Sequence, residues 1–75
     1  MGQLSGISGR DVRRVAERNG WVYQRNNGDH MILTRPGSRL NLSIPDHREL
    51  DPGMVRALIR ILGMSVAEFR EALKD

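Results

Sequence analysis

The first periodic stretch of apolar residues in the chain is SGRDVRRVAERNG, which begins at Ser8. Its apolar residues recur at the three- and four-residue spacing that lines one face of an α-helix. They are Val12, Val15 and Ala16. Ser8 suits the N-cap, Asp11 gives a weaker form of the capping box, and Asn19-Gly20 suits the C-terminal end. The pattern predicts a short helix whose other face carries several arginines.

A strand and a turn are predicted after this helix. Residues 21–25, WVYQR, are rich in β-branched and aromatic side chains, and the Asn-Gly pair in the following NNG is typical of a hairpin turn. Residues 29–35, DHMILTR, predict a second strand, and Pro36-Gly37 predicts a second turn. We therefore expect the first two strands to pair as an antiparallel hairpin.

The third predicted strand has the clearest alternation in the chain. In SRLNLSI, residues 38–44, the apolar residues Leu40, Leu42 and Ile44 alternate with polar ones. Such alternation predicts a strand with one buried face and one solvated face. Three strands joined by tight turns form an antiparallel meander.

Two further helices are predicted after the strands. Asp51 suits the N-cap of the second helix, Pro52 suits its first position, and Gly63 ends it. Its predicted core stripe is Met54, Leu58, Ile61 and Leu62. Ser65 and Glu68 form a capping box that begins a last short helix. The apolar residues of this last helix are Phe69 and Leu73.

The predicted order of elements is α-β-β-β-α with a small third helix. The apolar face of the sheet must be covered by helices, which predicts an α+β fold. We expect a three-stranded antiparallel sheet with the helices on one face, a layout that resembles the double-stranded-RNA-binding domain. We expect one domain over residues 8–75 and a flexible N-terminal segment over residues 1–7.

The composition excludes several classes of protein. A chain of 75 residues forms one small domain without room for a deep cofactor cavity, so we expect no cofactor. The absence of cysteine excludes disulfides and thiolate zinc sites. No apolar run approaches the roughly 18 residues of a membrane span. The N-terminal residues lack the pattern of a signal peptide, so we expect a cytoplasmic protein without membrane contact.

The charge is unevenly distributed along the chain. The net charge is +3, and eight arginines lie in residues 1–48 against four acidic residues. Arginine binds phosphate through a bidentate fork, so this half of the chain favours a nucleic-acid partner. The candidate phosphate-binding residues are Arg10, Arg13, Arg14, Arg35 and Arg39. The alternative is that they form an ordinary solvated surface.

Several landmarks together resemble the HicA-type toxins, also called the YcfA-like family of mRNA interferases. The motif GDH at Gly28-Asp29-His30 stands where that family has Gly-Ser-His, and IPDH, which ends at His47, stands where it has Pro-x-His. The segment RELDPGMVRALIRILGMSVAEF is similar to the last helices of the family. The resemblance extends from about Ser8 to Phe69.

The resemblance implies a metal-independent endoribonuclease that cleaves mRNA and is neutralised by a HicB-type antitoxin. Such cleavage uses the ribose 2′-hydroxyl as nucleophile and requires a proton acceptor, a proton donor and positive charge at the phosphate. Imidazole, with an ordinary pKa of about 6.5, can fill either proton role near neutral pH. The resemblance therefore implies His30 as the catalytic residue. Without it, a hydrogen-bonded structural role would be the default for His30.

Gly28, Asp29 and His47 are candidate auxiliary residues. Asp29 replaces the usual serine of the family, and as a strand residue it would point away from the face that carries its neighbour. Near a phosphate its charge would repel RNA, and near His30 it would favour the protonated imidazole. His47 precedes a helix, which favours backbone hydrogen bonding or antitoxin contact over catalysis. The spacing of His30 and His47 fits no common zinc pattern, so we expect no metal.

Two other functions remain open from the sequence. A non-enzymatic module of the same fold would bind structured RNA or a protein partner. The presence of Asp29 in place of the usual serine favours this alternative. A DNA-binding domain suits the charge, but the short helices show no helix-turn-helix pair. Trp21 and Tyr23 could stack on bases, although in a chain with three aromatic residues they fit the core better.

Overall fold

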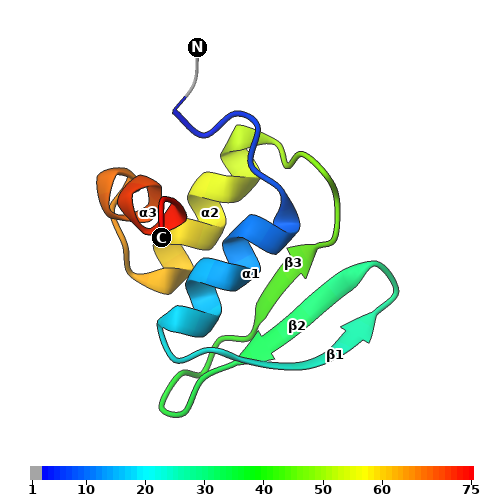
Figure 1. Ribbon diagram of the computed structural model, residues 1–75. Helices are drawn as coiled ribbons and strands as arrows, with labels where there is room; N and C mark the ends of the chain where they lie inside the picture. Colours follow the sequence, from blue (N-terminus) through cyan, green and yellow to red (C-terminus); the bar gives the residue numbers. More distant parts are fainter. Residues whose placement is uncertain (1–2) are drawn as a thin grey trace.

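The computed structural model describes residues 3–75 and contains three helices and three strands within them (Figure 1). The helices are α1 (Gly9–Arg18), α2 (Pro52–Leu62) and α3 (Val66–Leu73). The strands are β1 (Val22–Asn27), β2 (His30–Thr34) and β3 (Leu42–Pro45). The order α1-β1-β2-β3-α2-α3 confirms the predicted α+β fold with its layout like that of the double-stranded-RNA-binding domain.

Local capping explains where the helices begin. The Ser8 hydroxyl accepts a hydrogen bond from the Asp11 amide at 3.0 Å, and the Asp11 carboxylate accepts one from the Ser8 amide at 3.0 Å. Ser65 and Glu68 form the same capping box at the start of α3. The Asp51 carboxylate accepts a hydrogen bond from the amide two residues later, at the start of α2. These side chains satisfy backbone amides that have no partner within the helix.

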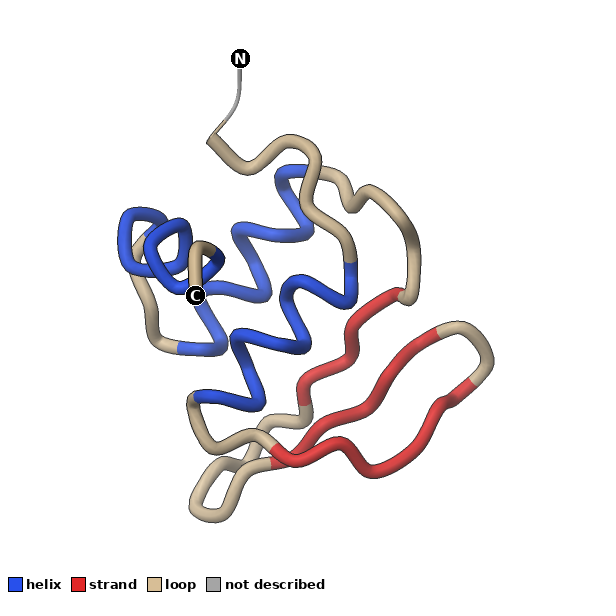
Figure 2. The backbone as a smooth tube through the Cα atoms, viewed as in Figure 1, coloured by secondary structure: helices blue, strands red, loops and turns tan. Residues whose placement is uncertain are grey.

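The sheet is antiparallel with β2 in the middle, and the helices lie together on one side of it (Figure 2). Met31 and Leu33 of β2 and Leu42 and Ile44 of β3 are buried in one cluster with the apolar faces of the helices. The helical and loop members of this core are Leu4, Ile7, Val12, Val15, Ala16, Trp21, Leu50, Val55, Leu58, Ile59, Leu62 and Phe69. The side chains that alternate with Met31 and Leu33 therefore lie on the other face of the sheet.

Two residues predicted to be buried are exposed. Leu40 is 59% exposed because β3 begins only at Leu42, so the preceding residues belong to the connection and not to the strand. Met54 is 41% exposed. The buried stripe of α2 is Val55, Leu58, Ile59 and Leu62. Apolar residues surround much of this helix, so periodicity allows two stripes, and only packing against the rest of the protein selects one.

Two side chains from the segment expected to be flexible lie in the core. Leu4 is 2% exposed and Ile7 is 4% exposed. The Ile7 carbonyl also accepts a hydrogen bond of 2.7 Å from the Leu50 amide. Residues 1 and 2 of that segment lie outside the described residues. Isolated apolar residues carry no periodic signal, so the sequence pattern gives no reason to place them in the core.

Gly9 lies where the start of α1 touches the end of β3. A Cβ atom on Gly9 would lie 1.8 Å from the Pro45 carbonyl oxygen, which is a backbone atom with little freedom to move. We therefore expect Gly9→Ala to lower the free energy of unfolding by about 1–3 kcal/mol through backbone displacement. Urea unfolding measures this change. The exposed Glu17→Ala variant of the same helix, expected to change it by less than about 0.5 kcal/mol, is the control. Equal stability of Gly9→Ala and wild type would contradict the prediction.

Candidate active site

The hairpin between β1 and β2 turns through Gly28 and Asp29, because Asn27 and His30 are paired across it. The turn thus lies one residue later than the Asn27-Gly28 pair that the sequence indicates. Gly28 has a φ of +62° at the first of the two loop positions, as a type II′ turn requires. Asp29 is consequently a loop residue, and the alternation of strand side chains does not keep it away from His30.

His30 is the first residue of β2 and lies on the face of the sheet opposite the helices. This follows because its neighbour Met31 is 2% exposed in the core. The imidazole is 45% exposed. The backbone of His30 is paired with Asn27 on one side and with Pro45 on the other. Strands on both sides therefore hold its Cα, while the ring stays accessible to solvent.

Asp29 joins the two histidines of the chain. Its Oδ1 lies 2.9 Å from Nδ1 of His30, and its Oδ2 lies 2.8 Å from Nε2 of His47. Because Asp29 belongs to the turn, the alternation of strand side chains does not apply to it, and of the alternatives open from the sequence the approach to His30 is the one observed. His47, the third candidate auxiliary residue, contacts Asp29 and so lies beside the hairpin turn. We call Asp29, His30 and His47 the histidine–aspartate cluster.

Backbone hydrogen bonds bring His47 to the hairpin. The Asp46 amide donates to the Asp29 carbonyl at 2.8 Å, and the Gly9 amide donates to the His47 carbonyl at 2.9 Å. The end of β3 is thereby fixed between the hairpin turn and the start of α1. These contacts join segments far apart in the sequence, so no local pattern predicts them.

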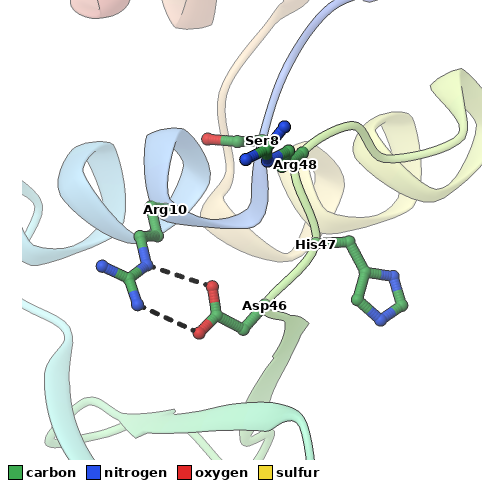
Figure 3. A pocket seen from close by; sticks show the side chains of 5 residues that line it. All are labelled: Ser8, Arg10, Asp46, His47 and Arg48. Carbon is green, nitrogen blue, oxygen red and sulfur yellow. Dashed lines mark hydrogen bonds and ion pairs between the residues drawn. The ribbon is translucent and has the colours of Figure 1, made fainter.

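An open hollow lies beside the cluster. It is lined by Ser8, Arg10, Asp46, His47 and Arg48 (Figure 3). Within it Nε and Nη2 of Arg10 donate to the two carboxylate oxygens of Asp46 at 3.1 and 3.3 Å. Figure 3 shows the imidazole of His47 directed away from this ion pair. The ion pair therefore leaves the His47 ring to Asp29.

The hydrogen bond with His47 lowers the pKa of Asp29 below its usual value, and the contact with His30 acts in the same direction. Loss of hydration opposes these effects in part. Asp29 is therefore a carboxylate at neutral pH and can only accept hydrogen bonds. The ring nitrogens that face it must carry protons. When a histidine of this cluster is neutral, its other ring nitrogen is a proton acceptor. This nitrogen is Nε2 in His30 and Nδ1 in His47.

The three candidate phosphate-binding arginines of α1 all make contacts within the protein. Arg10 is paired with Asp46, as described above. Arg13 lies 3.4 Å from a carboxylate oxygen of Glu17, and its guanidinium stacks over the ring of Tyr23. Arg14 is paired with Asp11 at 3.6 Å and also donates to the Leu73 carbonyl at 3.2 Å. All three remain partly exposed, at 79%, 32% and 44% of their side chains.

The two arginines near the second turn differ in their contacts. Arg35 stacks over the ring of Trp21, with its guanidinium carbon 5.4 Å from the ring centroid. Arg39 is exposed, and within residues 3–75 its side chain has no hydrogen bond or ion pair. Trp21 itself is 2% exposed, as expected for a core residue. The sequence reading of Trp21 as core and not as a stacking platform is therefore confirmed.

Sequence reasoning missed two cations near the cluster, Arg25 and Arg48. Arg25 is exposed and is the cross-strand partner of Ile32, which lies two residues from His30 on the same face of the sheet. Arg48 follows His47 and lines the hollow. Neither has an ion pair among the described residues. The irregularity between Tyr23 and Arg25 shifts the alternation of β1, so simple counting along the strand does not locate Arg25.

Residues 3–75 contain neither a metal-binding cluster of side chains nor a membrane-spanning helix. No group of three or more His, Cys, Asp or Glu side chains is arranged so that it could hold a metal ion. None of the helices combines the length and the apolar character needed to cross a membrane.

Comparison with known proteins identifies one matching family. The family described as HicA toxin of bacterial toxin-antitoxin matches residues 9–64, which is more than half of the chain and spans α1 to the end of α2. No curated protein matches the chain. The matched region contains all three residues of the histidine–aspartate cluster.

The ion pair between Arg10 and Asp46 gives an expected pH dependence. The hydrogen bond from Arg10 lowers the pKa of Asp46 below its ordinary 3.8. The pair therefore stabilises the fold above the unfolded-state pKa, and this contribution is lost as pH falls through the folded-state pKa. We expect Asp46→Asn to be less stable than wild type at neutral pH and to approach it at about pH 2. Urea unfolding at both pH values measures the difference, with Glu71→Gln as the control. A deficit of Asp46→Asn that grows on acidification would have the wrong sign.

Proposed function

The chain belongs to the HicA toxin family of bacterial toxin–antitoxin systems, and on this premise we propose that it is a metal-independent ribonuclease that cleaves mRNA. His30 transfers a proton in this reaction, and no cofactor takes part. A HicB-type antitoxin neutralises the protein in the cytoplasm by covering His30 and the basic surface around it.

The accessible imidazole of His30, held by a carboxylate at the tip of a hairpin, is the observation that carries the proposal. Asp29 accepts a hydrogen bond from Nδ1 and leaves Nε2 free to exchange a proton with RNA. A base oriented by a carboxylate through its other ring nitrogen is a recurring arrangement in enzymes that activate hydroxyl groups. Here the hydroxyl is the 2′-OH of ribose, which attacks the adjacent phosphate.

Cations close to His30 would bind the phosphate and stabilise the charge of the transition state. Arg25 and Arg48 are exposed without ion pairs among the described residues and would contact phosphates near His30 most readily. Arg39 is also exposed, but it lies in the connection between β2 and β3, at the end of the sheet opposite to His30, and would contact a more distant phosphate. Arg35 follows the end of β2 that lies away from His30 and would contribute there. Arg10, Arg13 and Arg14 would have to share their guanidinium groups between RNA and the contacts they already make. We therefore expect them to contribute less to RNA binding.

A second function is favoured by one specific observation. The carboxylate of Asp29 is 62% exposed and lies next to His30, so its charge would repel a phosphate at that position. A module that binds structured RNA or a protein partner without cleaving RNA would tolerate this charge.

Induced expression of wild type and His30→Ala, with RNA integrity read from the same cultures, tests the proposed function. We expect wild type to arrest growth and degrade mRNA, and His30→Ala to do neither. With purified proteins, we expect His30→Ala to cleave RNA about 10²- to 10⁴-fold more slowly, the usual contribution of a proton-transfer residue. Wild-type cleavage should persist in EDTA.

Circular dichroism of both proteins provides the control for folding. Growth arrest by both proteins without RNA loss would indicate toxicity through binding and would favour the second function. A folded wild type that binds RNA and leaves it intact would rule out the ribonuclease.

RNA affinity at several salt concentrations tests the role of Arg25. In a His30→Ala background, which keeps the RNA intact, we expect Arg25→Gln to reduce the slope of log affinity against log salt by about one phosphate contact. Fluorescence anisotropy with a labelled RNA measures the slope. Arg56→Gln removes another exposed cation, in α2 of the helical layer on the other side of the sheet, and should leave the slope unchanged. Equal slopes for the two variants would exclude Arg25 from the RNA-binding surface.

A further inference from the structure

Both histidines of the protein share one carboxylate. Asp29 contacts Nδ1 of His30 at 2.9 Å and Nε2 of His47 at 2.8 Å, through its two different oxygens. We propose that His47 is a second catalytic residue, which forms an acid–base pair with His30, and that Asp29 positions both rings. This inference rests on the proposed ribonuclease function and assigns a role to each member of the histidine–aspartate cluster.

The shared carboxylate keeps the two imidazole rings close together. Each imidazole is one hydrogen bond away from Asp29, so the rings are separated by no more than two hydrogen bonds and a carboxyl group. Nε2 of His30 and Nδ1 of His47 are the nitrogens that do not face Asp29. A phosphodiester beside the cluster could therefore meet a proton acceptor on one side and a proton donor on the other.

The exposure of the cluster argues against a purely structural role for these contacts. The side chains of Asp29 and His47 are 62% and 54% exposed, and ion pairs at such exposure contribute little to stability. Backbone hydrogen bonds from Gly9 to His47 and from Asp46 to Asp29 already hold this part of the chain. The imidazole of His47 is therefore not needed to anchor the segment, and it is directed away from the Arg10–Asp46 pair (Figure 3).

The pair supplies both proton transfers of the cleavage step. One histidine is neutral and accepts the proton of the 2′-hydroxyl, and the 2′-oxygen forms a bond to phosphorus. The bond between phosphorus and the 5′-oxygen breaks, and the other histidine, protonated, donates its proton to the departing 5′-oxygen. The products are a 2′,3′-cyclic phosphate and a 5′-hydroxyl. The two histidines have then exchanged protonation states, and proton exchange with water restores them.

The charged groups around His47 set the conditions for this role. Asp29 faces it from the hairpin turn and Asp46 precedes it in the chain. Arg10 of α1 and Arg48 line the same hollow as His47. Of these four groups, Asp29 is the one that contacts the ring.

Sulfur substitution at the leaving group tests the acid–base pair. The wild-type cleavage site in a short RNA is first mapped, and a matched RNA with a bridging 5′-sulfur at that site is then compared. A thiolate leaves without protonation, so loss of the general acid has little effect on the sulfur substrate. We expect His30→Gln and His47→Gln each to lose about 10²- to 10⁴-fold on the oxygen substrate. Only the variant that lacks the acid should recover to near the wild-type rate on the sulfur substrate.

The outcomes distinguish this inference from the proposed function. If His30→Gln loses activity and His47→Gln retains it, the ribonuclease stands and the acid–base pair is wrong. If both variants lose the same factor on both substrates, neither residue is the acid and the pair is also wrong. If wild type cleaves neither substrate, the proposed function fails and the inference fails with it. Arg56→Gln, a distant exposed cation, is the activity control, and thermal unfolding controls for the fold.

Asp29→Asn tests positioning in particular. The amide keeps one acceptor oxygen and replaces the other with an NH₂ group, so it can no longer accept from both rings. We expect kcat to fall, because both rings remain but one loses its orientation, while loss of the negative charge lowers KM and does not raise it. A change in KM alone would show that Asp29 affects RNA binding and does not position the histidines.

Discussion

Successive side chains of a β-strand point to opposite faces of the sheet, and in β2 this alternation places the candidate active site. Met31 and Leu33 are buried against the helices, so His30 and Ile32 must lie on the face of the sheet away from the helices. The helices cannot cover His30 without exposing the core residues of β2. A shift of one residue in the pairing of β2 would move the imidazole into the core and the apolar side chains into solvent. The stability of the core therefore keeps His30 accessible.

The parts of the fold that could be predicted from the sequence are those specified by neighbouring residues. Both capping boxes and the N-cap at Asp51 are confirmed, because a cap needs only a side chain and an amide two or three residues away. The failure at Met54 has the opposite cause. Several apolar stripes are compatible with the same segment of α2, and the choice depends on contacts with β3 and α1 that no local pattern contains. Leu40 illustrates the same limit at a strand end, since alternation continues past the point where pairing stops.

One residue of the candidate site, His30, could be predicted from the sequence. The arrangement of the three residues of the cluster could not. A family motif indicates His30, but the approach of His47 depends on backbone hydrogen bonds from Gly9 and Asp46 across the fold. Asp29 was misplaced because the turn was assigned one residue early. As a strand residue it would point away from His30, and as a turn residue it reaches both rings. The difference of one residue in the turn thus decides whether the cluster exists.

Under the proposed function, Asp29 also determines how the cluster interacts with the charge of RNA. When one imidazole is protonated, its positive charge cancels that of the carboxylate, and the cations Arg25 and Arg48 then act on the phosphate without opposition. When both imidazoles are neutral, the carboxylate leaves the cluster with a negative charge that repels the phosphate. When both are protonated, the phosphate is attracted but no ring can accept the 2′-hydroxyl proton. Only the singly protonated cluster contains both an acid and a base without net charge against RNA. Under the proposed function, the carboxylate of Asp29 therefore couples substrate binding to the protonation state that the acid–base pair requires.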